Sequence, residues 1–133
     1  MTIRRALMQF TDISMLIYWI VTALMAFSVF DIPAGMLFKE YDDPRVVAWN
    51  WSFFPIDIAF SLAGLLALRM EKKGTPAWQV VAAISLTLTF CAGIMAISYW
   101  AILAEFSLSW WGPNLFLMIW PLFYLPGLVK SVR

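Results

Sequence analysis

The sequence of 133 residues contains no histidine and a single cysteine, Cys91. The lack of histidine excludes a bis-histidine haem and zinc sites built from imidazole ligands. One cysteine excludes a disulfide framework and a thiol–disulfide relay, because each needs at least a pair. Nucleotide-binding glycine loops, nucleophile elbows and metal-ligand spacings are missing as well. We therefore expect no metal, no cofactor and no nucleic-acid partner.

Charged residues are scarce, at 13% of the chain, whereas hydrophobic residues make up 63%. Soluble domains contain only about 45–50% apolar residues. The few charges separate four long apolar blocks, at residues 13–30, 46–68, 74–104 and 106–129. A helix that spans a bilayer needs about 20 apolar residues, within a range of about 17–25. The predicted fold class is an all-α, polytopic integral membrane protein, in which residues 1–133 form a single transmembrane domain.

Cap and turn residues set the expected limits of the four helices, which are about 6–30, 44–69, 76–103 and 112–129. Asp43 precedes Pro44, and Thr75 precedes Pro76. An Asp or Thr that is followed by proline is typical of an N-cap and the first helical position. Short connections between the helices favour antiparallel packing as a four-helix transmembrane bundle. Small residues such as Ala92 and Ala96, four apart, let helix backbones approach closely in lipid.

Three prolines fall inside the predicted helices. Pro55, in the second helix, removes a backbone donor and leaves the carbonyl of Trp51 without its usual partner. Pro121 and Pro126 lie in the last helix, where they predict a kink or an early end.

Lysine and arginine are distributed unevenly between the connecting segments. Alternate segments carry seven of these residues on one side and two on the other. The positive-inside rule then places both termini in the cytoplasm and the acidic segment 31–45 outside. Arg4 and Arg5 before an apolar run imitate a signal peptide. That run is longer than a usual signal-peptide core, so we interpret it as a retained helix.

The eight tryptophans sort by depth. Five fall near the predicted outer ends of helices, which is typical of an interfacial aromatic belt: Trp49, Trp51, Trp100, Trp110 and Trp111. Trp78 lies near an inner end. Trp19 and Trp120 instead lie near the centres of their helices, and we expect them in one central layer with Asp57.

Asp57 is the only formal charge between Arg45 and Arg69. An acid at that depth costs about 2.5–3.5 kcal/mol, so it is normally turned toward protein or water. Intervals of 7, 4 and 3 residues place four positions on one face of the second helix: Asn50, Asp57, Ser61 and Gly64. This polar stripe predicts either the wall of a cavity or a hydrogen-bonded seam between helices.

Every lysine and arginine lies at a helix end or in a loop, so Asp57 has no cationic partner in the apolar interior. Desolvation disfavours an ionised carboxylate. Asp57 can then donate a hydrogen bond as a neutral acid, carry a proton, or bind a cationic ligand. The faces of Trp19 or Trp120 favour the third role through cation–π contacts.

Asp12 lies near the expected cytoplasmic end of the first helix. We interpret it first as an interfacial carboxylate paired with Arg5 or Lys73, and second as a functional acid. The candidate ligand-binding residues are Asp57, Asn50, Ser61, Trp19, Trp120 and Asp12. No catalytic residue and no metal ligand stands out.

Two segments, Tyr-Asp-Asp-Pro at 41–44 and Ala-Trp-Asn-Trp-Ser-Phe-Phe-Pro-Ile-Asp at 48–57, resemble those of the YvaD-like family of short bacterial membrane proteins. The opening Thr-Asp-Ile at 11–13, with Tyr18 and Trp19, is also similar to that family. The resemblance covers essentially the whole chain. It implies four helices in a bacterial cytoplasmic membrane, and it implies no activity.

The layout is also similar, more loosely, to the EXPERA group of four-helix proteins, which includes sterol isomerases and a sigma receptor. In that group an acid on the first helix and an acid on the second serve a lipophilic, often cationic ligand. Asp12 and Asp57 match those acids by position. The chain lacks the histidine expected of the isomerase branch.

Three functions stay open at this stage. The favoured hypothesis is a non-enzymatic binder or carrier of a small lipophilic ligand, a cation or a proton, which needs an enclosed cavity that reaches Asp57. An accessory or assembly subunit, packed against another membrane protein or a second copy, needs an outward-facing polar stripe. A membrane enzyme such as an isomerase needs a second ionisable group within reach of Asp57.

Overall fold

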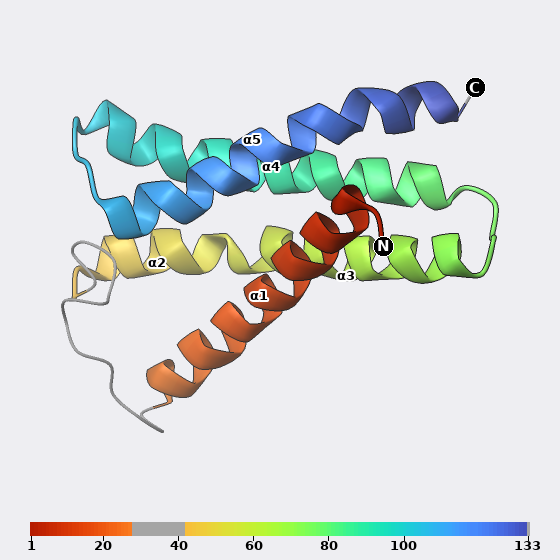
Figure 1. Ribbon diagram of the computed structural model, residues 1–133. Coiled ribbons are helices and arrows are strands. Elements are labelled where there is room, and N and C mark those ends of the chain that lie inside the picture. Colours follow the sequence, from red (N-terminus) through yellow and green to blue (C-terminus); the bar gives the residue numbers. More distant parts are fainter. Residues whose placement is uncertain (28–41, 133) are drawn as a thin grey trace.

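The computed structural model describes residues 1–27 and 42–132. These residues form five helical segments (Figure 1): α1 (Ile3–Ala26), α2 (Pro44–Ser52), α3 (Phe54–Lys72), α4 (Trp78–Ile102) and α5 (Leu108–Ser131). α2 and α3 follow one another as a single span. The described chain therefore has four helices that are long and apolar enough to cross a membrane. The prediction of an all-α chain with four such helices is confirmed.

The first helix begins at Ile3, three residues before the expected start at Ala6. Thr2 causes the earlier start, because its side chain accepts a hydrogen bond from the Arg5 N–H at 3.3 Å and so caps the helix. The last described helical residue is Ala26. The predicted end at residue 30 and most of the acidic segment 31–45 lie outside the described residues.

The second span is interrupted at Phe53, between α2 and α3. Pro55 has no N–H, so the Trp51 carbonyl lacks its i+4 donor, as the sequence predicts. The Phe53 N–H bonds to the Asn50 carbonyl at 3.2 Å, one residue closer than in an α-helix. As a result, Asp57 lies in the first turn of α3, where the helix dipole favours a negative charge.

α3 continues to Lys72, three residues beyond the expected end at Arg69. Gly74 follows with φ of 65°, and the Thr75 N–H bonds to the Met70 carbonyl at 2.9 Å. A left-handed glycine with this 6→1 bond is the Schellman motif. Gly74 therefore sets the end of α3, because it adopts the left-handed conformation that the Schellman motif requires.

The predicted start of the third span was wrong. Thr75 and Pro76 lie in the turn, and α4 begins at Trp78 with Ala77 as its N-cap. The N–H of Thr75 already caps α3, so this residue belongs to the end of one helix and not to the start of the next. Ala77 adopts a left-handed conformation, with φ of 67°.

The last span also differs from its prediction. α5 begins at Leu108 rather than near Gly112, because the Trp111 N–H bonds to the Ser107 carbonyl at 2.8 Å and forms an earlier turn. Of the two outcomes expected at the prolines, a kink or an early end, the early end was wrong. α5 continues through Pro121 and Pro126 to Ser131, consistent with the tolerance of membrane-spanning helices for proline.

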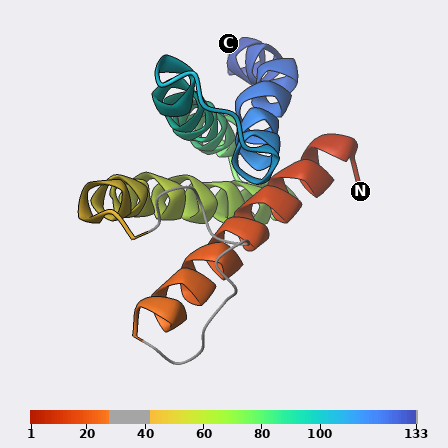
Figure 2. The same ribbon diagram turned by 90° about the vertical axis from the view of Figure 1, so that its left-hand side faces the viewer.

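The helices pack as a row in which α3 contacts α1 on one side and α4 on the other, while α5 packs on α4. α1 crosses α3 obliquely and diverges from α5 (Figures 1 and 2). We define the basic end of the bundle by Arg4, Arg5, Arg69, Lys72, Lys73 and Lys130. We define the tryptophan end by Trp49, Trp51, Trp100 and Trp110. Large apolar side chains such as Leu62 and Phe123 face outward, 56% and 77% exposed.

Candidate functional site

Two side-chain hydrogen bonds join α1 to the interrupted second span. The indole Nε1 of Trp19 donates to Asp57 Oδ2 at 2.8 Å, and the Tyr18 hydroxyl donates to Asn50 Oδ1 at 3.3 Å. Trp19, Asn50 and Asp57 are all buried. The structure therefore brings together three of the residues that the sequence singles out.

The Trp19 indole is held in place by other rings. Its centroid lies 5.1 Å from Tyr18, 5.1 Å from Trp51 and 5.3 Å from Phe54. Such aromatic contacts add about 0.5–1.5 kcal/mol each beyond the buried area. Trp19 is therefore a positioned donor for Asp57.

The second carboxylate oxygen of Asp57, Oδ1, has no hydrogen-bond partner within residues 1–27 and 42–132. Asp57 is 5% exposed and borders a cleft. One oxygen is thus engaged by Trp19, and the other is free to meet a group in the cleft.

The cleft lies between α1 and α5, over α3 and α4, and has a volume of about 510 Å³. At the side of the basic end it narrows where the rings of Phe10 and Phe116 meet edge to face, 6.1 Å apart. Ala92 and Ala96 of α4 border it, and their short side chains leave the space open. Ligand pockets typically have about 300–1,000 Å³ and a mainly apolar lining with few polar groups.

Among the described residues that line the cleft, Asp57 is the only Asp, Glu, Lys or Arg. Its polar neighbours in the lining are uncharged, and include Tyr18, Asn50 and Asn114. Rings of Trp19, Phe53 and Trp110 also border the space. The arrangement offers one acid in an aromatic and aliphatic surrounding.

Asp12 is not the interfacial carboxylate that the sequence suggests. It is 2% exposed and occupies a notch at Gly64, where an added Cβ would lie 2.0 Å from Asp12 Oδ2. This oxygen has no hydrogen-bond partner in the described structure. The crossing of α1 over α3 buries Asp12, because glycine leaves room at the contact.

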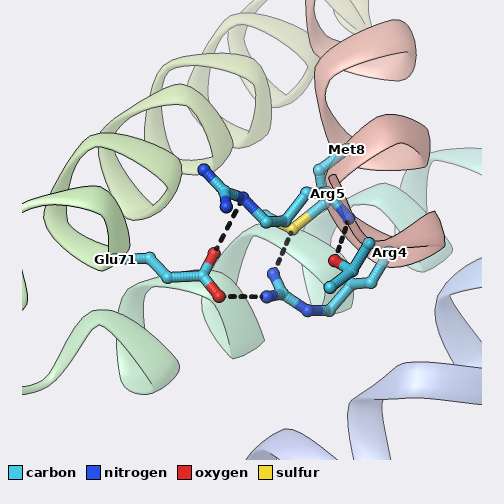
Figure 3. A network of polar contacts seen from close by, with 5 residues as sticks. Arg4, Arg5, Met8 and Glu71 are labelled. Atoms are coloured by element: carbon cyan, nitrogen blue, oxygen red, sulfur yellow. Dashed lines mark hydrogen bonds and ion pairs between the residues drawn. The ribbon is translucent and has the colours of Figure 1, made fainter.

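The expected pairing of Asp12 with Arg5 or Lys73 was wrong. Arg4 and Arg5 both form ion pairs with Glu71, on α3 (Figure 3), and Lys73 is exposed. Arg4 also lies over the ring of Trp78, 4.8 Å from its centroid. Glu71 pairs with both arginines because the last turn of α3 lies beside the start of α1.

Ser61 and Trp120 do not reach the cleft. Ser61 is fully buried, and its hydroxyl has no partner in the described part of the chain. Trp120 belongs to the hydrophobic core near the basic end, together with Met8 and Leu86. Similar distances from helix midpoints therefore did not imply proximity, since the helices cross at an angle and Trp120 faces a different layer.

The contribution of α5 to the site was missed from the sequence. Trp110 was interpreted as an interfacial residue, yet it lines the cleft and its Nε1 donates to the Ala96 carbonyl at 3.1 Å. Asn114 lines the cleft too, and its Nδ2 donates to the Trp110 carbonyl at 2.9 Å. The one sequence signal for this contribution was the pair Ala92 and Ala96 on α4, whose spacing of four residues predicts the close approach of another helix.

The other tryptophans at the tryptophan end pack with aromatic side chains. Trp49 stacks on Tyr99, with ring centroids 4.3 Å apart. Its centroid also lies 5.3 Å from that of Trp110 and 5.9 Å from that of Trp100. These contacts fix the wall formed by Trp110 at the tryptophan end of the cleft.

The fold and the site together define a small helical protein with four segments apolar enough to cross a membrane and one acid in a cleft between them. The chain belongs to the family of unknown function DUF5360, whose model matches residues 4–133. It is 42% identical over 123 residues to the "Uncharacterized protein YvaD" of Bacillus subtilis (strain 168), with 92% of this chain and 89% of that protein covered. No solved structure matches. The resemblance to the YvaD-like family is confirmed.

Proposed function

We propose that this protein is a non-enzymatic membrane binder or carrier that holds a small lipophilic cation at Asp57. The observation that carries the proposal is the cleft of about 510 Å³, in which Asp57 is the only Asp, Glu, Lys or Arg among the described lining residues. A carboxylate in an apolar site is stabilised by an opposite charge nearby. A bound cation would supply that charge.

The surroundings of Asp57 support a cationic ligand in two further ways. Trp19 holds Oδ2 and leaves Oδ1 open, so one oxygen can accept a hydrogen bond from an ammonium group. Rings of Tyr18, Phe53 and Trp110 border the same space, and aromatic faces attract cations by about 0.5–2 kcal/mol.

The other two hypotheses receive less support. An accessory subunit needs the polar stripe to face outward, whereas Asn50, Asp57 and Ser61 are buried within the chain. An isomerase needs a second ionisable group near Asp57, whereas the neighbouring lining residue with a titratable side chain is Tyr18, whose hydroxyl donates to Asn50.

We infer that the chain lies in the bacterial cytoplasmic membrane with its basic end inside. Seven lysines and arginines fall on the side of that end and two on the other, and the positive-inside rule relates this bias to orientation. The relative in Bacillus subtilis supports a bacterial membrane.

The experiment compares N,N-dimethyldodecylamine, which is protonated at neutral pH, with the neutral dodecan-1-ol. Each is added to the protein in lipid nanodiscs, and the thermal unfolding midpoint is followed. A ligand at about 100 times its Kd stabilises the native state by about 2.7 kcal/mol. The amine is expected to raise the midpoint and the alcohol to leave it unchanged.

Two variants decide whether Asp57 is responsible. Asp57→Asn removes a charge-assisted contact worth about 1.5–3 kcal/mol, so amine affinity should fall about tenfold to a hundredfold. Asp43→Asn is the matched control, because Asp43 caps α2 outside the cleft and asparagine caps equally well. Equal responses to amine and alcohol, or equal amine binding by the two variants, would refute the proposed function.

A further inference from the structure

The two ends of the cleft differ in chemistry. On the side of the tryptophan end, polar groups accompany Asp57, namely those of Tyr18, Asn50 and Ser109. Toward the basic end the lining contains Phe10, Phe116 and Leu117, with Thr11 as a polar member, and Ser14 and Asn114 lie between the two ends. Phe10 and Trp19 are nine residues apart on α1, which is about 13 Å at about 1.5 Å per residue. The cleft is therefore an elongated space with one polar end.

The cleft also opens sideways, between α1 and α5. On α1, the lining residues Phe10 and Tyr18 are 62% and 40% exposed. On α5, the lining residues Gly112 and Pro113 are exposed. The divergence of α1 from α5 is visible in Figure 2. When the four helices span a bilayer, an opening between two helices on the side of the molecule is bordered by lipid.

We propose that the ligand is a single-chain lipophilic amine that enters from the bilayer between α1 and α5. Its ammonium group lies at Asp57, and its hydrocarbon chain follows the cleft toward Phe10 and Leu117. This inference rests on the proposed function and adds the shape, the direction and the entry route of the ligand. A second charge at the far end would be buried among Phe10, Phe116 and Leu117 without a partner, so the ligand has one charged head.

The chain of such a ligand gains little by leaving the lipid, because lipid tails are as apolar as the cleft. Affinity therefore depends on the head group at Asp57, while the shape of the cleft determines where the chain lies. A chain-length series cannot test this arrangement. The test has to locate the chain.

Photolabelling locates it directly. Two N,N-dimethyldodecylamine probes are used in nanodiscs, one with a diazirine at the far end of the chain and one with a diazirine beside the nitrogen. After irradiation, mass spectrometry should find the far-end label around Phe10 and Leu117. The label beside the nitrogen should appear around Trp19 and Trp110. At a probe concentration below the Kd, Asp57→Asn should reduce both labels about tenfold to a hundredfold, as for amine affinity, and Asp43→Asn should preserve them.

A variant that narrows the cleft gives an independent readout. Ala92→Leu places a larger side chain in the lining, beside Gly93, where α4 meets the α5 backbone. Far-end labelling should fall about tenfold, a range that misfitting methylene groups produce in a tight pocket. The matched control is Ala101→Leu, because Ala101 is exposed near the end of α4.

The outcomes separate the two proposals. Asp57-dependent labelling whose far-end label falls on Ser109, or on outward-facing Leu62 and Ile84, would overturn the direction of the chain and leave the cation site standing. Equal labelling of the unaltered protein and Asp57→Asn would overturn both the cation site and the direction of the chain. If Ala92→Leu fails to fold, the label positions in the unaltered protein decide alone.

Discussion

At the scale of single residues, Gly64 has the closest side-chain neighbour among the described glycines, namely Asp12. A Cβ at Gly64 would meet Asp12 Oδ2 at 2.0 Å and Ser85 Oγ at 2.9 Å. Only a residue without a side chain lets α1 bring a carboxyl into this position. The sequence placed Gly64 on the correct face, but the depth of Asp12 depends on where two helices cross, and local periodicity does not contain that information.

Gly64→Ala should therefore be destabilising, although alanine is the better helix former. Overpacking costs about 1–3 kcal/mol, which outweighs a helix-propensity gain of about 1 kcal/mol. The matched control is Gly112→Ala, since nothing lies within 4 Å of a Cβ at Gly112, and it should be neutral or stabilising. Denaturant unfolding in detergent micelles checks the difference. Equal effects of the two changes on the unfolding free energy would contradict the close contact between Asp12 and Gly64.

The bond between Trp19 and Asp57 gives a second test at this scale. Trp19→Phe keeps an aromatic ring and removes the Nε1 donor, so it should cost about 1–3 kcal/mol in the unfolding free energy. In a double-mutant cycle with Asp57→Asn, the two changes should be non-additive by about 0.5–3 kcal/mol. Simple additivity would show that the bond contributes nothing. That Trp19 and Asp57 share a layer was predictable from their depth, whereas the donor–acceptor pairing was not.

At the scale of elements, the existence of the helices followed from the lengths of the apolar blocks, and their limits followed only in part. Asp43 caps α2 as predicted, with its side chain accepting from the Arg45 N–H at 2.8 Å. Pro55 was correctly identified as removing a donor. The interruption at Phe53, which places Asp57 in the first turn of α3, was not predicted, since proline is also tolerated within membrane helices.

The end of α4 has a left-handed residue, Ala104, that was not predicted from the sequence. Ala104 adopts φ of 54°, and the Glu105 N–H bonds to the Trp100 carbonyl at 2.9 Å. This left-handed position, normally occupied by glycine, costs a residue with a Cβ about 1–2 kcal/mol. Ala104→Gly should therefore stabilise the protein by roughly 0.5–1 kcal/mol. Ala101→Gly, inside the helix, should destabilise the protein by about 1 kcal/mol. Thermal unfolding of both variants shows whether each change raises or lowers the stability. The same sign for both would contradict the assigned helix end.

At the scale of the whole molecule, the orientation in the membrane is the first property to test. With the basic end in the cytoplasm, alkaline phosphatase fused after the last residue should be inactive, because it requires export. Fused within the acidic segment after Asp42, which connects α1 to α2, it should be active. Activity at the C-terminus would overturn the assignment, which depends on seven positive residues against two.

Polar contacts attach α1 to the second span at two places, in addition to its apolar packing. Toward the basic end, Arg4 and Arg5 hold Glu71, and Arg4 also covers Trp78. Toward the tryptophan end, the bonds from Trp19 and Tyr18 hold the second span. Because lipid removes the hydrophobic drive for helix association, such polar contacts add to the van der Waals packing of α1. Neither ion pair was predictable from sequence separation, since α1 and the end of α3 meet only after the chain has crossed twice.

Glu71→Gln should loosen α1 at the basic end and widen the cleft. The side chains of Arg4 and Glu71 are 13% and 20% exposed, so the loss of this charged contact should cost about 1–3 kcal/mol in unfolding free energy. The amine should also be released faster from this variant, because Phe10 and Phe116 would close the cleft less firmly. Lys72→Gln is the matched control, because it removes an exposed charge from the same turn. Nanodisc unfolding and amine release rates measure the two effects. Unchanged stability in Glu71→Gln would show that the ion pairs with Glu71 do not contribute to the attachment of α1.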